Sequence, residues 1–141
     1  GAGLPGIVLA IARPDVRFVL IEPMERRANW LIQVAQQLGL TNVEVIRARA
    51  EEVELTDFDI VTARAVAAMD KLVKMFTPLL RGGKGKTILA LKGGRAAIEL
   101  EEAKPRLKKL GFGDPEILVV GLGKAPETAT VVRVKLSKEG A

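Results

Sequence analysis

Short apolar segments alternate with longer amphipathic or charged segments along most of the chain, and this alternation constrains the fold more than any other feature. The short segments have the length and the Val, Ile and Leu content of buried strands, and the longer ones repeat apolar residues at helical spacing. We expect strands at residues 17–22, 43–47, 59–63, 87–92, 116–120 and 130–136, and helices at 4–12, 24–38, 70–80 and 95–110. Such an order predicts an α/β fold with a mostly parallel, doubly wound sheet.

The last two expected strands differ from the others because no helix separates them. A loop rich in glycine and proline joins residues 116–120 to residues 130–136, so this pair is predicted to be antiparallel. The chain has 141 residues, and we find neither an internal repeat nor a linker long enough to separate domains. We therefore predict a single domain over residues 1–141.

The composition excludes several classes of chemistry. With no cysteine and no histidine, the chain cannot form a disulfide, a zinc site of the usual ligands, or a thiol or imidazole catalyst, so no metal site is expected. No apolar run reaches the length of a membrane span and no signal-peptide pattern is present, which predicts a cytoplasmic protein without membrane insertion. The net charge of +5 is compatible with nucleic acid as a partner.

A glycine-rich turn opens the chain and is followed at a suitable distance by an acid. Residues 1–6 read GAGLPG, which satisfies the pattern G-x-G-x-x-G, and Glu22 ends the next expected strand. Gly1 and Gly3 would let a ligand lie against bare backbone, and the carboxylate could accept the hydroxyl protons of a ribose. NAD, FAD and S-adenosylmethionine all fit this arrangement, and a plain strand–helix turn is the structural alternative. Pro5 removes a backbone N–H that a pyrophosphate would use, which favours S-adenosylmethionine.

Other candidate residues also follow expected strands. Ala50 and Glu51 come after residues 43–47 and could meet an adenine edge, although a solvated loop acid is equally consistent with this position. Arg64 and Lys92 each stand at the carboxyl end of a strand, where open α/β sheets bind ligands, although exposed basic residues are common. The charges at residues 99–109 indicate a solvated helix face.

Five blocks in this order carry a resemblance to a known family: GAGLPGIVLAIARPD, LIEP, RAEEV, TARAVA and LALKG. Together they resemble the RsmG (GidB) family of bacterial methyltransferases over residues 1 to about 121. The resemblance implies a Rossmann-like methyltransferase fold and transfer of a methyl group from S-adenosylmethionine to N7 of a guanine in 16S ribosomal RNA. The RNA could be free or part of a small-subunit particle.

The resemblance also implies roles for individual residues. Gly1, Gly3 and Leu4 would line the S-adenosylmethionine site, and Glu22 would hold its ribose. Ala50 and Glu51 would flank the adenine. Two basic residues would act in catalysis: Arg64, which would face the reaction centre beside the cofactor, and Lys92, which would contact RNA or substrate.

In methyltransferases of this architecture, a further strand precedes the glycine turn and lies in the middle of the sheet. We therefore expect the first strand of the fold to be missing from this chain, between the strands at residues 17–22 and 59–63. Its absence would leave the two neighbouring strands with unpaired edges, and these would either close up and pair with each other or accept a strand from another chain. Either outcome predicts marginal stability and weak cofactor binding for the 141-residue chain alone.

The expected chemistry agrees with the residues that the chain lacks. Methylation of a pyrimidine C5 would need a cysteine nucleophile, whereas guanine N7 already offers a lone pair and needs no protein base. Two other functions stay open from the residues alone. One is a dinucleotide-dependent oxidoreductase that uses the same turn and Glu22, and the other is a non-catalytic fragment that binds RNA without a cofactor.

Overall fold

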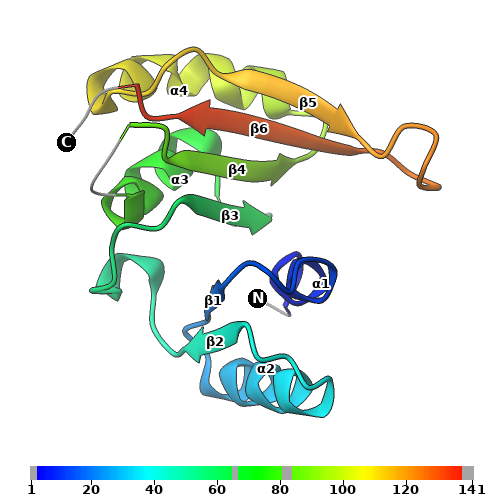
Figure 1. Ribbon diagram of the computed structural model, residues 1–141. Helices are drawn as coiled ribbons and strands as arrows, with labels where there is room; N and C mark the ends of the chain where they lie inside the picture. Colours follow the sequence, from blue (N-terminus) through cyan, green and yellow to red (C-terminus); the bar gives the residue numbers. More distant parts are fainter. Residues whose placement is uncertain (1–2, 65–66, 81–83, 138–141) are drawn as a thin grey trace. The chain divides into compact units, whose positions relative to one another are not determined.

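The computed structural model describes residues 3–64, 67–80 and 84–137, and its helices and strands alternate along the chain (Figure 1). The chain divides into two compact units, Gly1–Val53 and Glu54–Ala141, which are described in turn.

The first unit contains two parallel strands and two α-helices. Its elements in chain order are α1 (Gly6–Ala12), β1 (Phe18–Ile21), α2 (Glu25–Gln37), β2 (Val43–Ile46) and the short 3-10 helix η1 (Ala50–Glu52). Strands β1 and β2 pair in register from Phe18 opposite Val43 to Ile21 opposite Ile46. The strands appear where the apolar runs predicted them, and the helical spacing of α2 also appears as predicted.

The core of the first unit forms where α1 packs against β1 and α2 against β2. Helix α2 buries Ala28, Leu31 and Ala35, which share one face because they are spaced by three and four residues. Gly6 allows α1 to approach β1 closely, because a Cβ at this position would lie 2.3 Å from Leu20 Cδ2. The close contact thus depends on the absence of a side chain at the first residue of α1.

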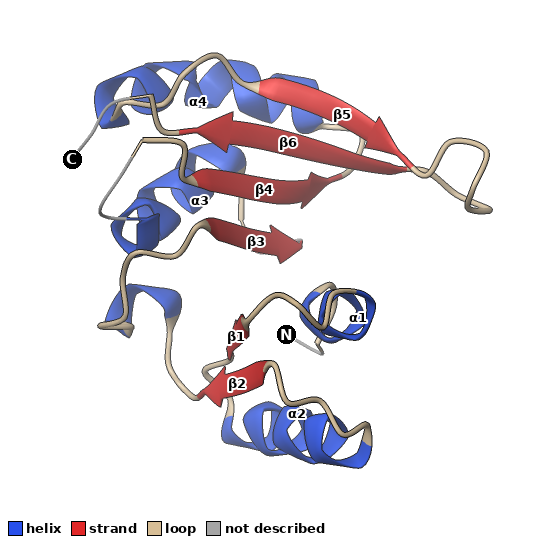
Figure 2. Cartoon of the chain, viewed as in Figure 1, coloured by secondary structure: helices blue, strands red, loops and turns tan. Residues whose placement is uncertain are grey.

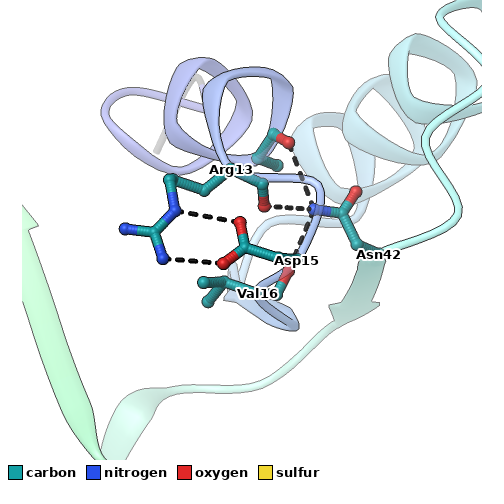
Figure 3. Close-up of polar contacts among 5 residues, drawn as sticks. Arg13, Asp15, Val16 and Asn42 are labelled. Carbon is teal, nitrogen blue, oxygen red and sulfur yellow. Dashed lines mark hydrogen bonds and ion pairs between the residues drawn. The ribbon is translucent and has the colours of Figure 1, made fainter.

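The turn between α1 and β1 is held by one amide side chain (Figure 3). Asn42 Nδ2 lies 3.1 Å from the carbonyl oxygens of Ala10 and Arg13 and 2.9 Å from that of Val16. Since the amide has only two protons, the three carbonyls share them. Beside it, Arg13 Nη2 and Asp15 Oδ2 form an ion pair at 2.7 Å, and this bond holds the pKa of Asp15 at about 2. Asn42 therefore connects the end of α1 and the entry to β1 with the start of β2.

We expect Asn42→Asp to destabilise the protein by about 1–3 kcal/mol, the cost of breaking buried or part-buried hydrogen bonds. The substitution keeps the shape of the side chain but replaces the donor with an acceptor that faces three carbonyl oxygens. Urea unfolding of the variant measures the loss. Asn29→Asp makes the same chemical change on the exposed side of α2 and serves as the control. Equal losses in the two variants would contradict the role given to Asn42.

The second unit is a four-stranded mixed sheet with two α-helices (Figure 2). Its elements are β3 (Ile60–Arg64), α3 (Met69–Phe76), the 3-10 helix η2 (Thr77–Leu80), β4 (Thr87–Lys92), α4 (Ala96–Leu110), β5 (Glu116–Val120) and β6 (Ala129–Lys135). The strand order is β3-β4-β6-β5. Strands β3 and β4 are parallel, and β6 is antiparallel to both of its neighbours.

The core of the second unit lies between the sheet and the paired helices α3 and α4. Arg106 Nε on α4 bonds Asp70 Oδ1 on α3 at 2.8 Å and joins the two helices. The fully or almost fully buried side chains come from both helices, from η2 and from the two central strands: Met69, Leu72, Val73, Ala103, Leu107, Leu80, Ile88, Ala90, Val132 and Val134. Helix α4 continues through Pro105, although proline removes one N–H from the helical hydrogen bonds.

The expected antiparallel pair is confirmed, and it lies at one end of the sheet. The last strand, β6, inserts between β4 and β5, so β5 occupies the edge. The expected helix at residues 70–80 divides into α3 and η2, because Pro78 has no N–H to continue the α-helical hydrogen bonds. In the described part of the chain, β1 pairs with β2 in the first unit, and β3 pairs with β4 in the second.

Candidate functional site

Glu22 is a buried acid at the carboxyl end of β1. The residue is only 2% exposed. Its backbone N–H donates a hydrogen bond to the Ile46 carbonyl at 3.0 Å and so extends the pairing of β1 with β2. Burial raises the pKa of the Glu22 carboxyl. Hydrogen bonding, which includes a bond from the Met24 N–H at 3.2 Å, and the charge of Arg27 lower this pKa by more than burial raises it. The net pKa is below the usual range, so the group is a carboxylate at neutral pH. A buried carboxylate at a strand end is suited to accept hydroxyl protons from a ligand.

Gly3 lies in the opening turn, and its backbone conformation requires glycine. Its φ of +89° lies in the left-handed region, and a Cβ would lie 2.8 Å from Ile7 Cγ1 and 2.9 Å from Leu31 Cδ2. Its carbonyl accepts the Ile7 N–H at 2.7 Å, which places the turn at the start of α1. Leu4 is exposed, and Gly1 lies outside the described residues.

Ala50 and Glu51 lie in η1, which follows β2. Ala50 is half-buried and the Glu51 side chain is exposed. Because β1 and β2 are parallel and in register, Glu22 and η1 follow the same ends of the two strands. The structure thus brings Glu22 and the Ala50–Glu51 segment to one edge of the two-stranded sheet, as expected for residues that serve one ligand.

Arg64 and Lys92 lie in the second unit, at the carboxyl ends of β3 and β4. These strands are parallel, with Arg64 opposite Leu91, so both residues lie at the end of the four-stranded sheet where β3 and β4 finish. Arg64 is exposed and is available to a ligand.

Lys92 has a different environment from Arg64. Its side chain is only 8% exposed, its Nζ lies 3.0 Å from Glu99 Oε2, and it donates a hydrogen bond to the Ala67 carbonyl. The ammonium group is therefore committed to partners within the fold, and the structure does not support the predicted direct contact of Lys92 with RNA.

Sequence reasoning missed Glu99 as a partner in this arrangement. The charged run at residues 99–109 predicted a solvated helix face, yet the Glu99 side chain is only 19% exposed. The available signal was its position beside the apolar stripe of α4, formed by Ala96, Leu100, Ala103 and Leu107. A residue at the border of such a stripe can turn toward the core when a buried cation is present.

Among the described residues, no group of three or more acidic, cysteine or histidine side chains could hold a metal ion. No helix in the same residues is long and apolar enough to cross a membrane.

Comparison with known proteins places these features in a family. The model of the GidB family, rRNA small subunit methyltransferase G, matches residues 1–125. The chain belongs to this family. The matched residues include the glycine turn, Glu22, the Ala50–Glu51 segment, Arg64 and Lys92.

Curated members of the rRNA small subunit methyltransferase G family match almost the whole chain. The protein of Arthrobacter sp. (strain FB24) is 50% identical over 139 residues, which are 98% of this chain and 63% of that protein. The protein of Thermobifida fusca (strain YX) is 50% identical over 138 residues, 97% of this chain and 57% of that protein. The chain thus spans about 60% of the length of these relatives.

Solved structures confirm the S-adenosylmethionine-dependent methyltransferase fold. A SAM-dependent O-methyltransferase from Thermotoga maritima has a TM-score of 0.69 and 16% identity, covering 100% of this chain and 58% of its own. The methyltransferase SibL has a TM-score of 0.73 and 14% identity, covering 98% of this chain and 48% of its own. At these identities the likeness establishes the α/β fold with mixed strands and leaves the substrate to other arguments.

Proposed function

We propose that this chain forms part of an S-adenosylmethionine-dependent methyltransferase that methylates N7 of a guanine in 16S ribosomal RNA. The observation that carries the proposal is the family match, which spans the glycine turn, the buried Glu22 and both basic strand ends. The net charge of +5 and the absence of a thiol nucleophile agree with an RNA substrate methylated at a ring nitrogen. A cytoplasmic location with the ribosomal RNA follows from this substrate.

Residues of the first unit fit an S-adenosylmethionine site. Glu22 offers a charged acceptor for ribose hydroxyls at the edge where η1 also lies. Gly3 and Leu4 provide a turn with no side chain at its buried position, and Ala50 and Glu51 would flank the adenine. When bound, S-adenosylmethionine supplies an electrophilic methyl group on a sulfonium. The Glu22 carboxylate and the turn would orient the nucleoside so that the methyl group is presented to the acceptor.

Arg64 is the candidate that acts on the guanine itself. N7 of guanine holds its own lone pair, so attack on the methyl group requires alignment and no proton removal. Guanine presents O6 and N7 as adjacent acceptors, and an exposed guanidinium can donate to O6 while N7 reacts. The exposed Arg64 at the end of β3 can fill this role. Lys92 would support the same sheet edge from within the fold.

The test is the identity of the methylated nucleoside. The intact protein is incubated with S-adenosylmethionine carrying an isotopic methyl label and with either naked 16S ribosomal RNA or small-subunit particles. We expect labelled 7-methylguanosine by nucleoside mass spectrometry, and the better of the two substrates identifies the natural partner. Arg64→Ala should lower turnover by about tenfold or more with little change in cofactor affinity, because it removes a positioning donor only.

Lys109→Ala removes an exposed positive charge from the end of α4 and serves as the control. Label on adenine or cytosine would contradict the proposal. Tighter binding of NAD than of S-adenosylmethionine would instead favour an oxidoreductase, and RNA binding with no cofactor binding would favour a non-catalytic RNA-binding protein.

A further inference from the structure

The only tryptophan of the chain lies on the outward side of α2. The core side of this helix carries Ala28, Leu31 and Ala35, and helical geometry places residue 30 away from that stripe. Trp30 is 49% exposed. The packing of the described residues thus leaves half of this large aromatic side chain in contact with solvent, where a ligand can reach it.

Basic and amide side chains surround Trp30. Together with Met24, Arg26, Arg27, Asn29 and Gln33 it lines an open hollow whose wall is mainly apolar. One acid occurs in α2, Glu25, and its Oε2 lies 3.6 Å from Arg47 Nη1. Within the described residues, the side chains of Arg26 and Arg27 form neither a hydrogen bond nor an ion pair. We call this set of six residues the Trp30 surface.

The chemistry of the Trp30 surface fits a nucleic acid strand. An exposed indole offers a face on which an unpaired base can stack, whichever base it is. The guanidinium groups of Arg26 and Arg27 form no hydrogen bond or ion pair that fixes them within the described residues, although the charge of Arg27 acts on the Glu22 carboxylate, and both can contact backbone phosphates near that base. The amides of Asn29 and Gln33 can donate to and accept from base edges or 2′-hydroxyls.

We propose that the Trp30 surface docks a single-stranded segment of RNA, with a base stacked on Trp30 and phosphates held by Arg26 and Arg27. The proposal rests on the proposed function, because it assigns part of the RNA substrate to a surface of this chain. An acidic protein segment is the alternative occupant, but it would use the two arginines and leave the indole without a specific partner.

Trp30 is the one tryptophan of these 141 residues, so the part of the tryptophan emission that Trp30→Phe removes reports on the surface. The intact protein is titrated with a single-stranded oligoribonucleotide of 16S sequence. We expect saturable quenching of the emission, because a base stacks on the indole. Poly-glutamate, used as a second titrant, should leave the emission unchanged. Quenching by poly-glutamate, or RNA binding without any change in emission, would overturn the proposal.

Variants then separate stacking from charge, with binding followed by the anisotropy of labelled RNA. Trp30→Leu should weaken binding by about tenfold to a hundredfold, and Trp30→Phe, which keeps a stacking face, should recover most of it. The pair Arg26→Gln and Arg27→Gln should lower the slope of log K against log salt by about two. The control pair, Lys108→Gln and Lys109→Gln, removes the same charge from exposed positions on α4 and should leave the slope nearly unchanged.

Failure of this proposal can be distinguished from failure of the proposed function. If the unsubstituted protein produces 7-methylguanosine and the variants of the Trp30 surface keep its KM for RNA, the proposed docking surface is wrong and the proposed function stands. If the natural sequence methylates no RNA, the proposed function is wrong. Thermal melts of each variant confirm that changes in binding come from folded protein.

Discussion

Glu22→Ala is expected to weaken S-adenosylmethionine binding by about 1–3 kcal/mol, which is roughly five- to 150-fold in the dissociation constant. The substitution removes a charged acceptor at the end of β1 and leaves the ribose hydroxyls of the ligand facing alanine. Titration calorimetry on the intact protein measures the change. Because hydrogen bonding and the charge of Arg27 outweigh the effect of burial and place the pKa of the Glu22 carboxyl below its usual range, the natural protein should keep its affinity down to about pH 5, above the ordinary glutamate pKa.

Two comparisons isolate the contribution of the carboxylate. Glu22→Gln keeps the size of the side chain and should also bind weakly, because the amide carries no charge and presents its donor to hydroxyl groups. Glu102→Ala removes an exposed acid from α4 and should bind as the natural protein does. Unchanged affinity in Glu22→Ala would show that the ribose is held elsewhere.

Lys92→Met is expected to lower the free energy of unfolding substantially, because it leaves Glu99 without its counter-charge. Loss of one member of a buried ion pair costs about 3–5 kcal/mol, and the lower part of that range applies here because the Glu99 side chain keeps 19% exposure. The substitution also removes the hydrogen bond to the Ala67 carbonyl, close in sequence to Arg64. Turnover should therefore fall together with stability. Urea unfolding and a methylation assay measure the two quantities on the same samples.

The double variant Lys92→Met with Glu99→Gln decides between two roles for Lys92. Since it replaces the ion pair with neutral groups of similar size, we expect it to recover most of the lost stability, and turnover with it. Such recovery identifies Lys92 as a positioning residue that supports the edge where Arg64 lies. A double variant that is stable but inactive would instead restore the direct role with RNA or substrate that the sequence pattern indicated.

Local patterns in the sequence determined the elements and their type. The run at residues 87–92 became β4 and the run at 116–120 became β5 with the predicted bounds, because each is a short apolar segment with breakers at its ends. The spacing of Ala28, Leu31 and Ala35 likewise placed α2 and its buried face. The antiparallel relation of the last two strands followed from the short connection between them.

The partners that these elements and side chains meet were decided only by the tertiary structure. The insertion of β6 between β4 and β5, the three carbonyls around Asn42 and the Lys92–Glu99 pair all join residues distant in the chain or turned toward the core. Periodicity reports which face of an element is apolar, but it does not report which strand supplies the adjacent hydrogen bonds or which charge is buried beside another. Those choices depend on the summed packing and hydrogen bonding of many long-range contacts, and a segment read by itself contains none of them.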